Sequence, residues 1–402
     1  MSDHSHEITP PHAERFDLKH AGGWPNYLLG AGVVGLAISL VGLIFDQWRT
    51  QFAFSWLFGF TYFFTILVGT LFWICLHHAT DSQWSVVVRR QLENVSKLLL
   101  YLWVGFLPII VFCKPLLWKW WNFPAGHEPA LDLKAGYLNH GFFYFRVVVY
   151  FAALAGLSYW MWIRSTSQDK DGAARHTLTM RKLGVAGIVV VALCITFSAV
   201  DWLMGLDFHW YSTMWGVYIF AGAAGSSLSL LILIIGALQK KGYLKIVNEE
   251  HYHIMGKYLL AFTIFWAYIG FDQYMLIWYA NIPEETSYFL LRNTETWWYL
   301  SSMLVWCRFV LPFPVLLFQF IKKNNAIYYV SGWVLFMQLV DVYVIVLPVL
   351  HRTGVVFSIF DLSAVVGIGG ILGWLFFTQI IGKSNLFPAR DPRLLAALKL
   401  TN

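Results

Sequence analysis

Ten apolar stretches dominate this chain, and each is close to the 20 or so residues that a helix needs to cross a bilayer. Inside the hydrocarbon every backbone polar group must be hydrogen-bonded within the protein, which leaves helices and closed barrels. Outer-membrane barrels use strands of about 10 residues with alternating polarity, a pattern absent from these stretches. The sequence therefore predicts an all-α polytopic membrane protein with ten transmembrane helices, over residues 25–45, 54–77, 98–117, 140–163, 183–204, 213–238, 258–280, 297–320, 326–350 and 358–381.

The composition supports this interpretation. Hydrophobic residues make up 58% of the chain and charged residues 12%, whereas soluble domains carry roughly 25% charged residues. These values argue against a soluble enzyme, a disordered chain and a fibrous protein. The net charge of +6 comes from basic residues in the connections between helices, so we expect no nucleic-acid partner.

The distribution of Lys and Arg predicts the orientation. The N-terminal segment, the even-numbered connections and the C-terminal segment hold 20 of them, and the odd-numbered connections with their helix ends hold six. Cytoplasmic connections collect Lys and Arg, so both termini are expected in the cytoplasm. The first 24 residues are polar and lack the apolar core of a signal peptide.

Several motifs occur twice, in the same order. Asn-x-Pro follows an aromatic cluster at Asn122–Pro124 and again at Asn281–Pro283, after the third and seventh helices. One arginine then lies in the fourth and one in the eighth helix, Arg146 and Arg308, and one aspartate in the fifth and one in the ninth, Asp201 and Asp341. A weaker pair is Gly59 and Gly216. We interpret this as two parallel four-helix repeats, with coincidence in an aromatic-rich chain as the alternative.

The expected organisation follows from these repeats. It comprises a polar cytoplasmic N-terminal segment (1–24), a peripheral first helix (25–53), a four-helix bundle (54–204), a second four-helix bundle (205–350), a peripheral tenth helix (351–381) and a cytoplasmic C-terminal segment (382–402).

Charged residues at membrane depth are costly and often mark a functional path. From helix direction and rise, all of them fall at mid-membrane or in its outer half. A proton half-channel is one interpretation, and a buried salt-bridge network that only fixes helix register is the other. The candidate proton-path residues are Asp201, Asp272, Asp341, Arg146, Arg308, Lys114, Asp207 and His209, with Asp46, His140, His351 and Asp361 extending the polar set outward.

The inner half of the membrane is expected to be drier. It offers Thr65, Thr70 and the small-polar run Gly225–Ser229. At the inner end of the seventh helix, Glu249, Glu250, His251 and His253 form a candidate proton-collecting group.

Redox cofactors lack recognisable ligands in the sequence. A membrane b-type haem needs two histidines facing each other across helices, but His77 and His78 lie at the inner side and His140, His209 and His351 at the outer side. The four cysteines lie singly on four helices, without a metal-binding spacing. We therefore expect no haem, iron–sulfur cluster or metal in this chain. A quinone contact at His140 and Asp201 is a weaker candidate.

Four segments outside the helices are candidates for docking partner proteins. The outer connections 118–139 and 281–296 are rich in Trp, Glu and Pro. The N-terminal segment and Phe387–Arg393 are the others, with plain solvated ends as the alternative.

Two long segments carry a resemblance to a known family. They run from Ser198 through Asp201, Asp207 and His209 to Trp215–Gly216, and from Phe271–Asp272 through Trp278 to Glu284–Glu285. With ten helices and a four-helix duplication, the chain resembles the NrfD-like (PsrC-like) membrane subunits over essentially its whole length. It is most similar to the ActF type, found in bacterial alternative complex III.

The resemblance implies a role in a quinol:cytochrome c oxidoreductase of the bacterial inner membrane. Haem c and iron–sulfur clusters would lie in partner subunits, and the ActC-like paralogue would hold the quinol site. The ActF-type subunit would contribute structure and a candidate proton path. The implied partners are the iron–sulfur subunit, haem c subunits, the ActC-like subunit, small membrane subunits, lipids and, in some complexes, a terminal oxidase.

Three functions thus compete. The first is a cofactor-free subunit that anchors the complex and conducts protons. The second is the quinol-oxidising subunit itself, with a site near His140 and Asp201. The third is an independent secondary transporter, because parallel repeats and charges at the membrane midplane occur in that class as well.

Overall fold

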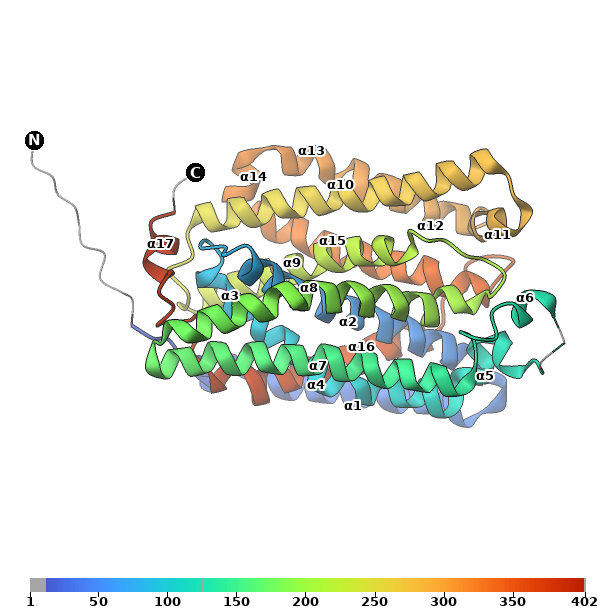
Figure 1. Cartoon of the computed structure of the whole chain (residues 1–402), viewed down its shortest axis with the longest axis horizontal. Coiled ribbons are helices and arrows are strands. Elements are labelled where there is room, and N and C mark those ends of the chain that lie inside the picture. The colour runs from blue at the N-terminus through green and yellow to red at the C-terminus, as the bar shows by residue number, and fades with distance from the viewer. Residues whose placement is uncertain (1–11, 125, 127, 401–402) are drawn as a thin grey trace, which may run out of the picture.

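The protein folds into a bundle of long helices, as the apolar stretches predict. A computed structural model describes residues 12–124, 126 and 128–400. It is 80% helical, and the described residues form no strand. Ten helical segments are long and apolar enough to cross a membrane. The prediction of an all-α, multi-pass membrane protein is confirmed. The first and last described residues lie at the same end of the bundle (Figure 1). We call this end, which the sequence predicts to face the cytoplasm, the inner end, and the opposite end the outer end.

The ten spans are built from thirteen α-helices and several short 3₁₀ or π segments, with α6, α11, α14 and α17 outside them. In chain order the α-helices are α1 (Trp24–Ile44), α2 (Asp46–Ala79), α3 (Val86–Ser96), α4 (Leu99–Pro108), α5 (Lys114–Leu117), α6 (Pro129–Asp132), α7 (His140–Asp171), α8 (Ala174–Trp202), α9 (Trp215–Lys240), α10 (Glu249–Ala280), α11 (Pro283–Arg292), α12 (Trp297–Met303), α13 (Pro312–Leu317), α14 (Gln319–Lys323), α15 (Ala326–Val346), α16 (Ile359–Leu375) and α17 (Leu394–Leu398).

Two spans are interrupted near proline, which has no backbone N–H and clashes with the preceding turn. In the third span, α4 ends at Pro108 and passes through a π-helical turn, Ile109–Cys113, into α5. In the eighth span, α12 continues as a π-helical segment, Leu304–Val310, before Pro312 starts α13. Wider π turns are frequent at functional positions, and this one contains Arg308.

Helices α2 and α9 cross at the centre of the molecule. Gly69 of α2 lies directly against the backbone of Ala223, and the Trp73 indole N–H donates to the carbonyl of Ala224 at 2.9 Å. Helix α8 packs against both α2 and α9, and α15 packs against both as well. Lipid tails are as apolar as the helices, so no hydrophobic force drives membrane helices together. They associate instead through close backbone contact at small residues.

Replacing Gly69 by alanine is therefore expected to destabilise the protein. The added Cβ would collide with the Ala223 carbonyl, and overpacking of this kind costs about 1–3 kcal/mol or more. The matched control is Gly156→Ala in α7, where a Cβ meets no atom within 4 Å and better helix propensity adds up to about 1 kcal/mol. Apparent unfolding temperatures in detergent provide the comparison, and equal values for the two variants would contradict the packing argument.

The first and tenth spans form a pair on one side of α2. Helices α1 and α16 make the most extensive contact in the molecule, with Gly35 against Gly367 and a 2.9 Å hydrogen bond between Ser39 and Ser363. Helix α16 then packs on α2, where Ala364 lies against Gly59.

Four spans begin eight or more residues earlier than the sequence predicts. Helix α8 starts at Ala174 instead of residue 183, and α10 at Glu249 instead of residue 258. Helix α2 starts at Asp46, so residues 46–53, predicted to belong to the peripheral first segment, extend the second span. The third span starts at Val86 instead of residue 98. Its first turns are polar, and hydropathy alone assigns such a segment to a connection.

The chain ends are not simply solvated. Residues 1–11 of the predicted N-terminal segment (1–24) lie outside the described residues. Phe16 is buried, and Arg15 pairs with Asn385 in an isolated antiparallel bridge. The side chains of Leu386 and Phe387 are 0% exposed. The interpretation of Phe387–Arg393 as a solvated end is therefore wrong, because apolar anchors hold it against the bundle.

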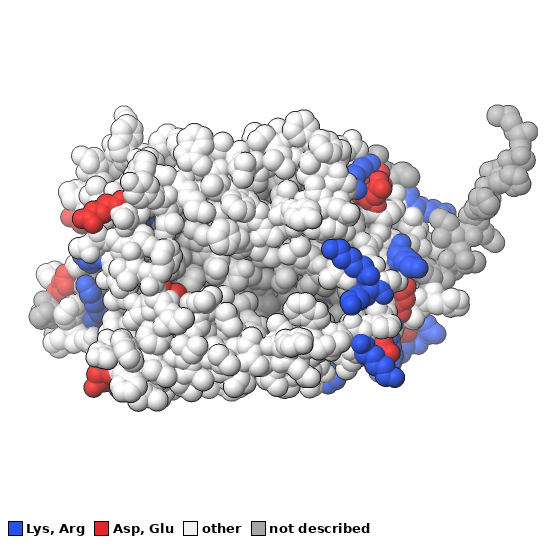
Figure 2. Space-filling view, turned by 180° about the vertical axis from the view of Figure 1, so that it is seen from behind, with Lys and Arg blue, Asp and Glu red and all other residues white. Residues whose placement is uncertain are grey.

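The charges gather at the two ends of the bundle and leave an apolar band between them (Figure 2). Blue basic side chains concentrate at the end that carries the N-terminal segment, and the opposite end shows a mixture of both signs. A band of this kind is the surface that a bilayer covers.

Candidate functional site

The first charged centre joins α7 and α8. The Arg146 guanidinium forms two parallel hydrogen bonds to the Asp201 carboxylate, Nε to Oδ2 at 2.8 Å and Nη2 to Oδ1 at 2.9 Å. The Tyr150 hydroxyl donates to the same carboxylate at 2.7 Å. Asp201 is only 1% exposed, so its charge depends on these three donors.

Aromatic and backbone groups complete this centre. The ring of Tyr137 lies 3.8 Å and that of Phe142 4.4 Å from the Arg146 guanidinium carbon. A third N–H of Arg146 donates to the Tyr137 carbonyl at 2.9 Å. The arginine is thereby fixed in position by its carboxylate partner, a carbonyl and two ring faces.

The second charged centre joins the eighth and ninth spans and has the same chemistry. Arg308, in the π-helical segment, lies 2.8 Å from the Asp341 carboxylate of α15. The Tyr218 hydroxyl of α9 donates to that carboxylate at 2.5 Å and the Trp266 indole N–H of α10 at 3.3 Å. The Trp266 ring also lies over the guanidinium, 4.1 Å from its central carbon.

The two centres are equivalent in their parts. Each contains an arginine, an aspartate, a tyrosine hydroxyl and an aromatic ring over the guanidinium, and each aspartate lies near the outer end of its helix. Among the site residues predicted from the sequence, two ion pairs form: Arg146 with Asp201, and Arg308 with Asp341. The sequence pattern matches Arg146 with Arg308 and Asp201 with Asp341 as equivalent positions, with a buried salt-bridge network as one interpretation. In the structure each arginine forms an ion pair with the aspartate of its own predicted repeat.

Lys114 and Asp272 join neither centre. Lys114 Nζ donates to the Tyr144 hydroxyl at 2.7 Å and lies 5.4 Å from the Trp121 ring centre. Asp272 is half-buried on α10 and has no hydrogen-bond or ion-pair partner among the described residues. An unpaired carboxylate at this depth is costly.

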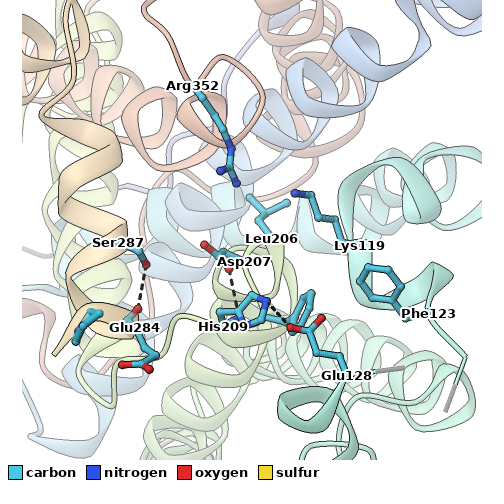
Figure 3. Close-up of a pocket in the computed structure, with 11 residues that line it drawn as sticks. Lys119, Phe123, Glu128, Leu206, Asp207, His209, Glu284, Ser287 and Arg352 are labelled. Atoms are coloured by element: carbon cyan, nitrogen blue, oxygen red, sulfur yellow. Dashed lines mark hydrogen bonds and ion pairs between the residues drawn. The ribbon is translucent and has the colours of Figure 1, made fainter. Parts of the chain in front are cut away.

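Asp207 and His209 line an open pocket of about 550 Å³ at the outer end (Figure 3). His209 lies 3.0 Å from the Glu128 carboxylate, and Asp207 accepts a hydrogen bond from the His209 backbone N–H. Lys119 and Arg352 point into the same space from two different connections. The pocket therefore joins outer connections of both predicted repeats.

The weaker quinone candidates, His140 and Asp201, bond to different partners. His140 is exposed, its ring stacks on Trp121 at 4.0 Å, and its Nε2 lies 3.2 Å from the Trp121 carbonyl. Asp201 is buried and occupied by Arg146 and Tyr150.

The inner group at the start of α10 does come together. Asn248 caps the helix and bonds to His251. Glu250 forms an ion pair with Lys323 of α14, Glu249 is exposed, and the His253 Nδ1 is buried without a hydrogen-bond partner among the described residues. This group therefore lies at the inner surface with one carboxylate free to face water.

The inner half also holds a buried polar cluster that sequence reasoning missed. Arg90 lies 2.9 Å from Glu93 and 2.8 Å from Asp169, and Arg89 lies 3.4 Å from Asp391. Both ring nitrogens of His77 lack a hydrogen-bond partner within the described part of the chain. The cluster members, each no more than 1% exposed, are His77, His78, Arg89, Arg90, Gln91, Glu93 and Asn94. The expectation of a dry inner half is thus wrong at this end of α2 and α3.

A pair of basic residues at the outer end was also missed. Lys134 donates to the Phe208 carbonyl at 2.7 Å, just beyond α8, and Arg292 donates to the carbonyls of Val344 and Ile345 at 2.9 and 2.6 Å, at the end of α15. Burial lowers the pKa of both groups. Cations at helix C-termini satisfy free carbonyls and the helix dipole. The signal available in the sequence was their similar spacing from the two Asn-x-Pro motifs: Lys134 lies 12 residues after Asn122, and Arg292 lies 11 residues after Asn281.

Within the described residues, no three His, Cys, Asp or Glu side chains lie close enough together to hold a metal ion. Comparison with known proteins adds no identification, because neither a protein-family model nor a curated protein sequence matches the chain.

Proposed function

We propose that this chain is a cofactor-free integral membrane subunit of a respiratory quinol:cytochrome c oxidoreductase of the alternative complex III type. In this proposal it anchors the complex in the bacterial inner membrane, with both termini in the cytoplasm, and conducts protons through its buried carboxylates. The observation that carries the proposal is the pair of equivalent Arg–Asp–Tyr centres, at Asp201 and Asp341.

The centres have the parts that proton transfer requires. A carboxylate held by an arginine and a tyrosine hydroxyl can accept a proton when the arginine moves away, and the hydroxyl can pass one on. The outer pocket at Asp207 and His209 opens to water six residues after Asp201, and the inner cluster brings ionisable groups to the opposite end. These groups could act as the two ends of a path through ordered water.

The partner subunits belong to the proposal as well. Quinol oxidation needs redox centres, and haem c and iron–sulfur clusters would be held by subunits outside the membrane. The quinol site would lie in an ActC-like paralogue, because in this chain Asp201 already bonds to Arg146 and Tyr150, and His140 to the Trp121 carbonyl.

The test is Asp341→Asn in the intact complex, reconstituted in vesicles. We expect quinol:cytochrome c turnover to be retained and proton release per electron to fall, because the amide keeps the shape of the carboxylate but cannot carry the proton. Tyr218→Phe is the milder second variant, since it removes only the hydroxyl that donates to Asp341.

The control is Asp46→Asn, which removes a carboxylate that is 88% exposed at the outer end. This variant should change neither quinol:cytochrome c turnover nor proton release per electron. Unchanged proton release in both test variants would leave the paired centres with a purely structural role. Loss of turnover in parallel with proton release would instead favour the quinol-oxidising alternative.

A further inference from the structure

Lys97, at the junction of α3 and α4, is a buried cation without an anionic partner. Its side chain belongs to a residue that is only 9% exposed, and its Nζ makes no hydrogen bond or ion pair with the described residues. The Nζ lies over the ring of Trp162 of α7, 3.4 Å from the ring centre. Glu93, four residues earlier, lies 2.9 Å from Arg90 and is paired there instead. Because an ammonium group has three N–H donors, Lys97 keeps donors for an anion.

The polar groups around Lys97 are also donors. The Trp162 indole N–H is buried without a hydrogen-bond partner among the described residues, and it is a direct neighbour of the ammonium that lies over its ring. The same holds for the side-chain N–H of Asn94, three residues before Lys97 on the same face of α3. Lys383, a second cation, acts on Lys97 electrostatically and donates only to the neutral Gln379. Two ammonium groups and two N–H donors thus gather in one place.

These donors lie at the level where the predicted apolar stretches end. Lys97 directly precedes the third stretch, Trp162 is the last residue but one of the fourth, and Lys383 follows the tenth by two residues. A hydrogen bond of 3.3 Å from the Ser384 hydroxyl to Asn94 Oδ1 holds the end of the tenth span against α3. The polar headgroups of a bilayer occupy this level.

An apolar surface continues from the donors toward the middle of the membrane. Tyr101 and Val104 of α4 follow Lys97 by four and seven residues, which places them on the same side of the third span. Tyr159 precedes Trp162 by three residues on α7. All three side chains are exposed, and α4 packs against α7 (Figure 1). A lipid with its headgroup at Lys97 could therefore lay its acyl chains along both helices.

We infer that Lys97 and Lys383 bind the phosphate group of an anionic phospholipid, with the Trp162 indole N–H as a further donor. The negative phosphate accepts charge-assisted hydrogen bonds and offsets the repulsion between the two ammonium groups. Basic pockets between helices at the cytoplasmic side of a membrane recognise lipid headgroups in this way. A free phosphate ion offers the same oxygen atoms but leaves the apolar surface of α4 and α7 unused. The inference does not depend on the proposed respiratory role, because it requires only that the ten spans lie in a bilayer.

The experiment measures lipid binding to the full-length chain, purified in detergent and delipidated. Microscale thermophoresis gives the dissociation constant of phosphatidylglycerol and of phosphatidylcholine, and the phosphatidylglycerol titration is repeated with inorganic phosphate as competitor. The variants are Lys97→Met, which keeps an unbranched stem over Trp162 without the charge, and Lys383→Met. The second variant leaves the contact between Lys97 and Trp162 intact, so it tests the site even where Lys97→Met does not fold.

The matched control is Lys182→Met. Lys182 directly precedes the fifth apolar stretch, as Lys97 precedes the third, but its side chain is exposed on α8. A loss of general attraction between a basic surface and an anionic lipid would appear in this variant as well.

We expect the unmodified protein to bind phosphatidylglycerol about tenfold more tightly than phosphatidylcholine. Lys97→Met should weaken the binding of phosphatidylglycerol about tenfold, because a charge-assisted hydrogen bond in a site shielded from water is lost. Lys383→Met, at an exposed position, should weaken it about fivefold, and Lys182→Met less than about twofold. Equal affinities for the two lipids, equal effects of all three substitutions, unchanged binding in Lys97→Met and Lys383→Met, or displacement of the lipid by an equal concentration of inorganic phosphate would each overturn the inference.

Discussion

Replacing Arg146 by methionine is expected to lower the apparent unfolding temperature by roughly 10 °C, the largest effect of any single side chain in the two charged centres. The methionine fills similar space but leaves Asp201, which is 1% exposed, with only the Tyr150 hydroxyl as a donor. Removal of one partner of a buried ion pair costs about 3–5 kcal/mol, because the other charge remains buried without compensation.

A second substitution distinguishes the effect of an uncompensated buried charge from the effect of lost packing. In Arg146→Met with Asp201→Leu both charges are gone, and replacing a whole buried pair by apolar residues is often nearly neutral. We therefore expect the double variant to regain most of the lost stability. A double-mutant cycle measures this recovery as a coupling free energy between the two positions.

The control is the same change in an exposed pair. Arg175 lies 2.9 Å from Asp171, with its side chain 77% exposed, and such pairs contribute about 0–1 kcal/mol. Arg175→Met should shift the unfolding temperature by no more than a few degrees. If Arg146→Met behaved like Arg175→Met, the paired centres would not be the electrostatic supports that their geometry indicates.

Removal of the C-terminal segment, by a stop codon at Ser384, is expected to abolish accumulation of folded protein. The deletion strips away Leu386, Phe387, Leu394 and Ala397, whose side chains are at most 3% exposed. It also removes Asp391, the carboxylate beside the buried guanidinium of Arg89. Burial of one large apolar side chain stabilises a protein by about 1.5–3 kcal/mol, and total stabilities are only about 5–15 kcal/mol.

Asp391→Asn is the milder test and gives a pH dependence. Burial alone would raise the pKa of Asp391, but the hydrogen bonds and charge of Arg393, together with the charge of Arg89, outweigh it and lower the pKa below its usual value. The unfolded value is about 3.9. The Asp391 carboxylate thus stabilises the fold fully above about pH 4, and this contribution is lost as the pH falls through the lower folded pKa.

The readout is the difference in unfolding temperature between the unmodified protein and Asp391→Asn. We expect a constant difference from pH 5 to pH 8 and a shrinking difference below about pH 4. Other carboxylates titrate in the same range, but they do so in both proteins and cancel in the comparison. A difference that stayed constant down to the lowest pH would contradict the role assigned to the charge of Asp391.

The spans were predictable because hydrophobic length is a direct consequence of bilayer thickness. The inner start of the third span was not predictable. Charged residues such as Arg89, Arg90 and Glu93 are typical of a solvated connection, and only their contacts with α7 and the C-terminal segment explain why they are buried. Asp169 lies 79 residues from Arg90, and Asp391 lies 302 residues from Arg89. Local patterns contain no information on contacts of that separation.

The two charged centres were likewise predictable only in part. The ordered recurrence of Arg146 with Arg308 and of Asp201 with Asp341 was visible in the sequence, and so was their depth. The tyrosine partners were not visible in the sequence, because they do not recur at matching places. Tyr150 lies on the same helix as Arg146, whereas Tyr218 lies on α9 and not on the span of Arg308. The two centres thus contain the same kind of group, a tyrosine hydroxyl, supplied by helices at different places in the two predicted repeats.

The bridge between Arg15 and Asn385, with Leu386 donating to the Glu14 carbonyl at 2.7 Å, has a consequence for biosynthesis. A ribosome makes Asn385 370 residues after Arg15, so the bridge cannot form until all ten spans have been synthesised. Until then Arg89 and Gln91, which bond to Asp391 and to the Leu386 carbonyl, enter the membrane without their final partners. A prematurely terminated chain would keep those polar groups exposed at the inner surface, where proteases that remove incomplete membrane proteins can reach them.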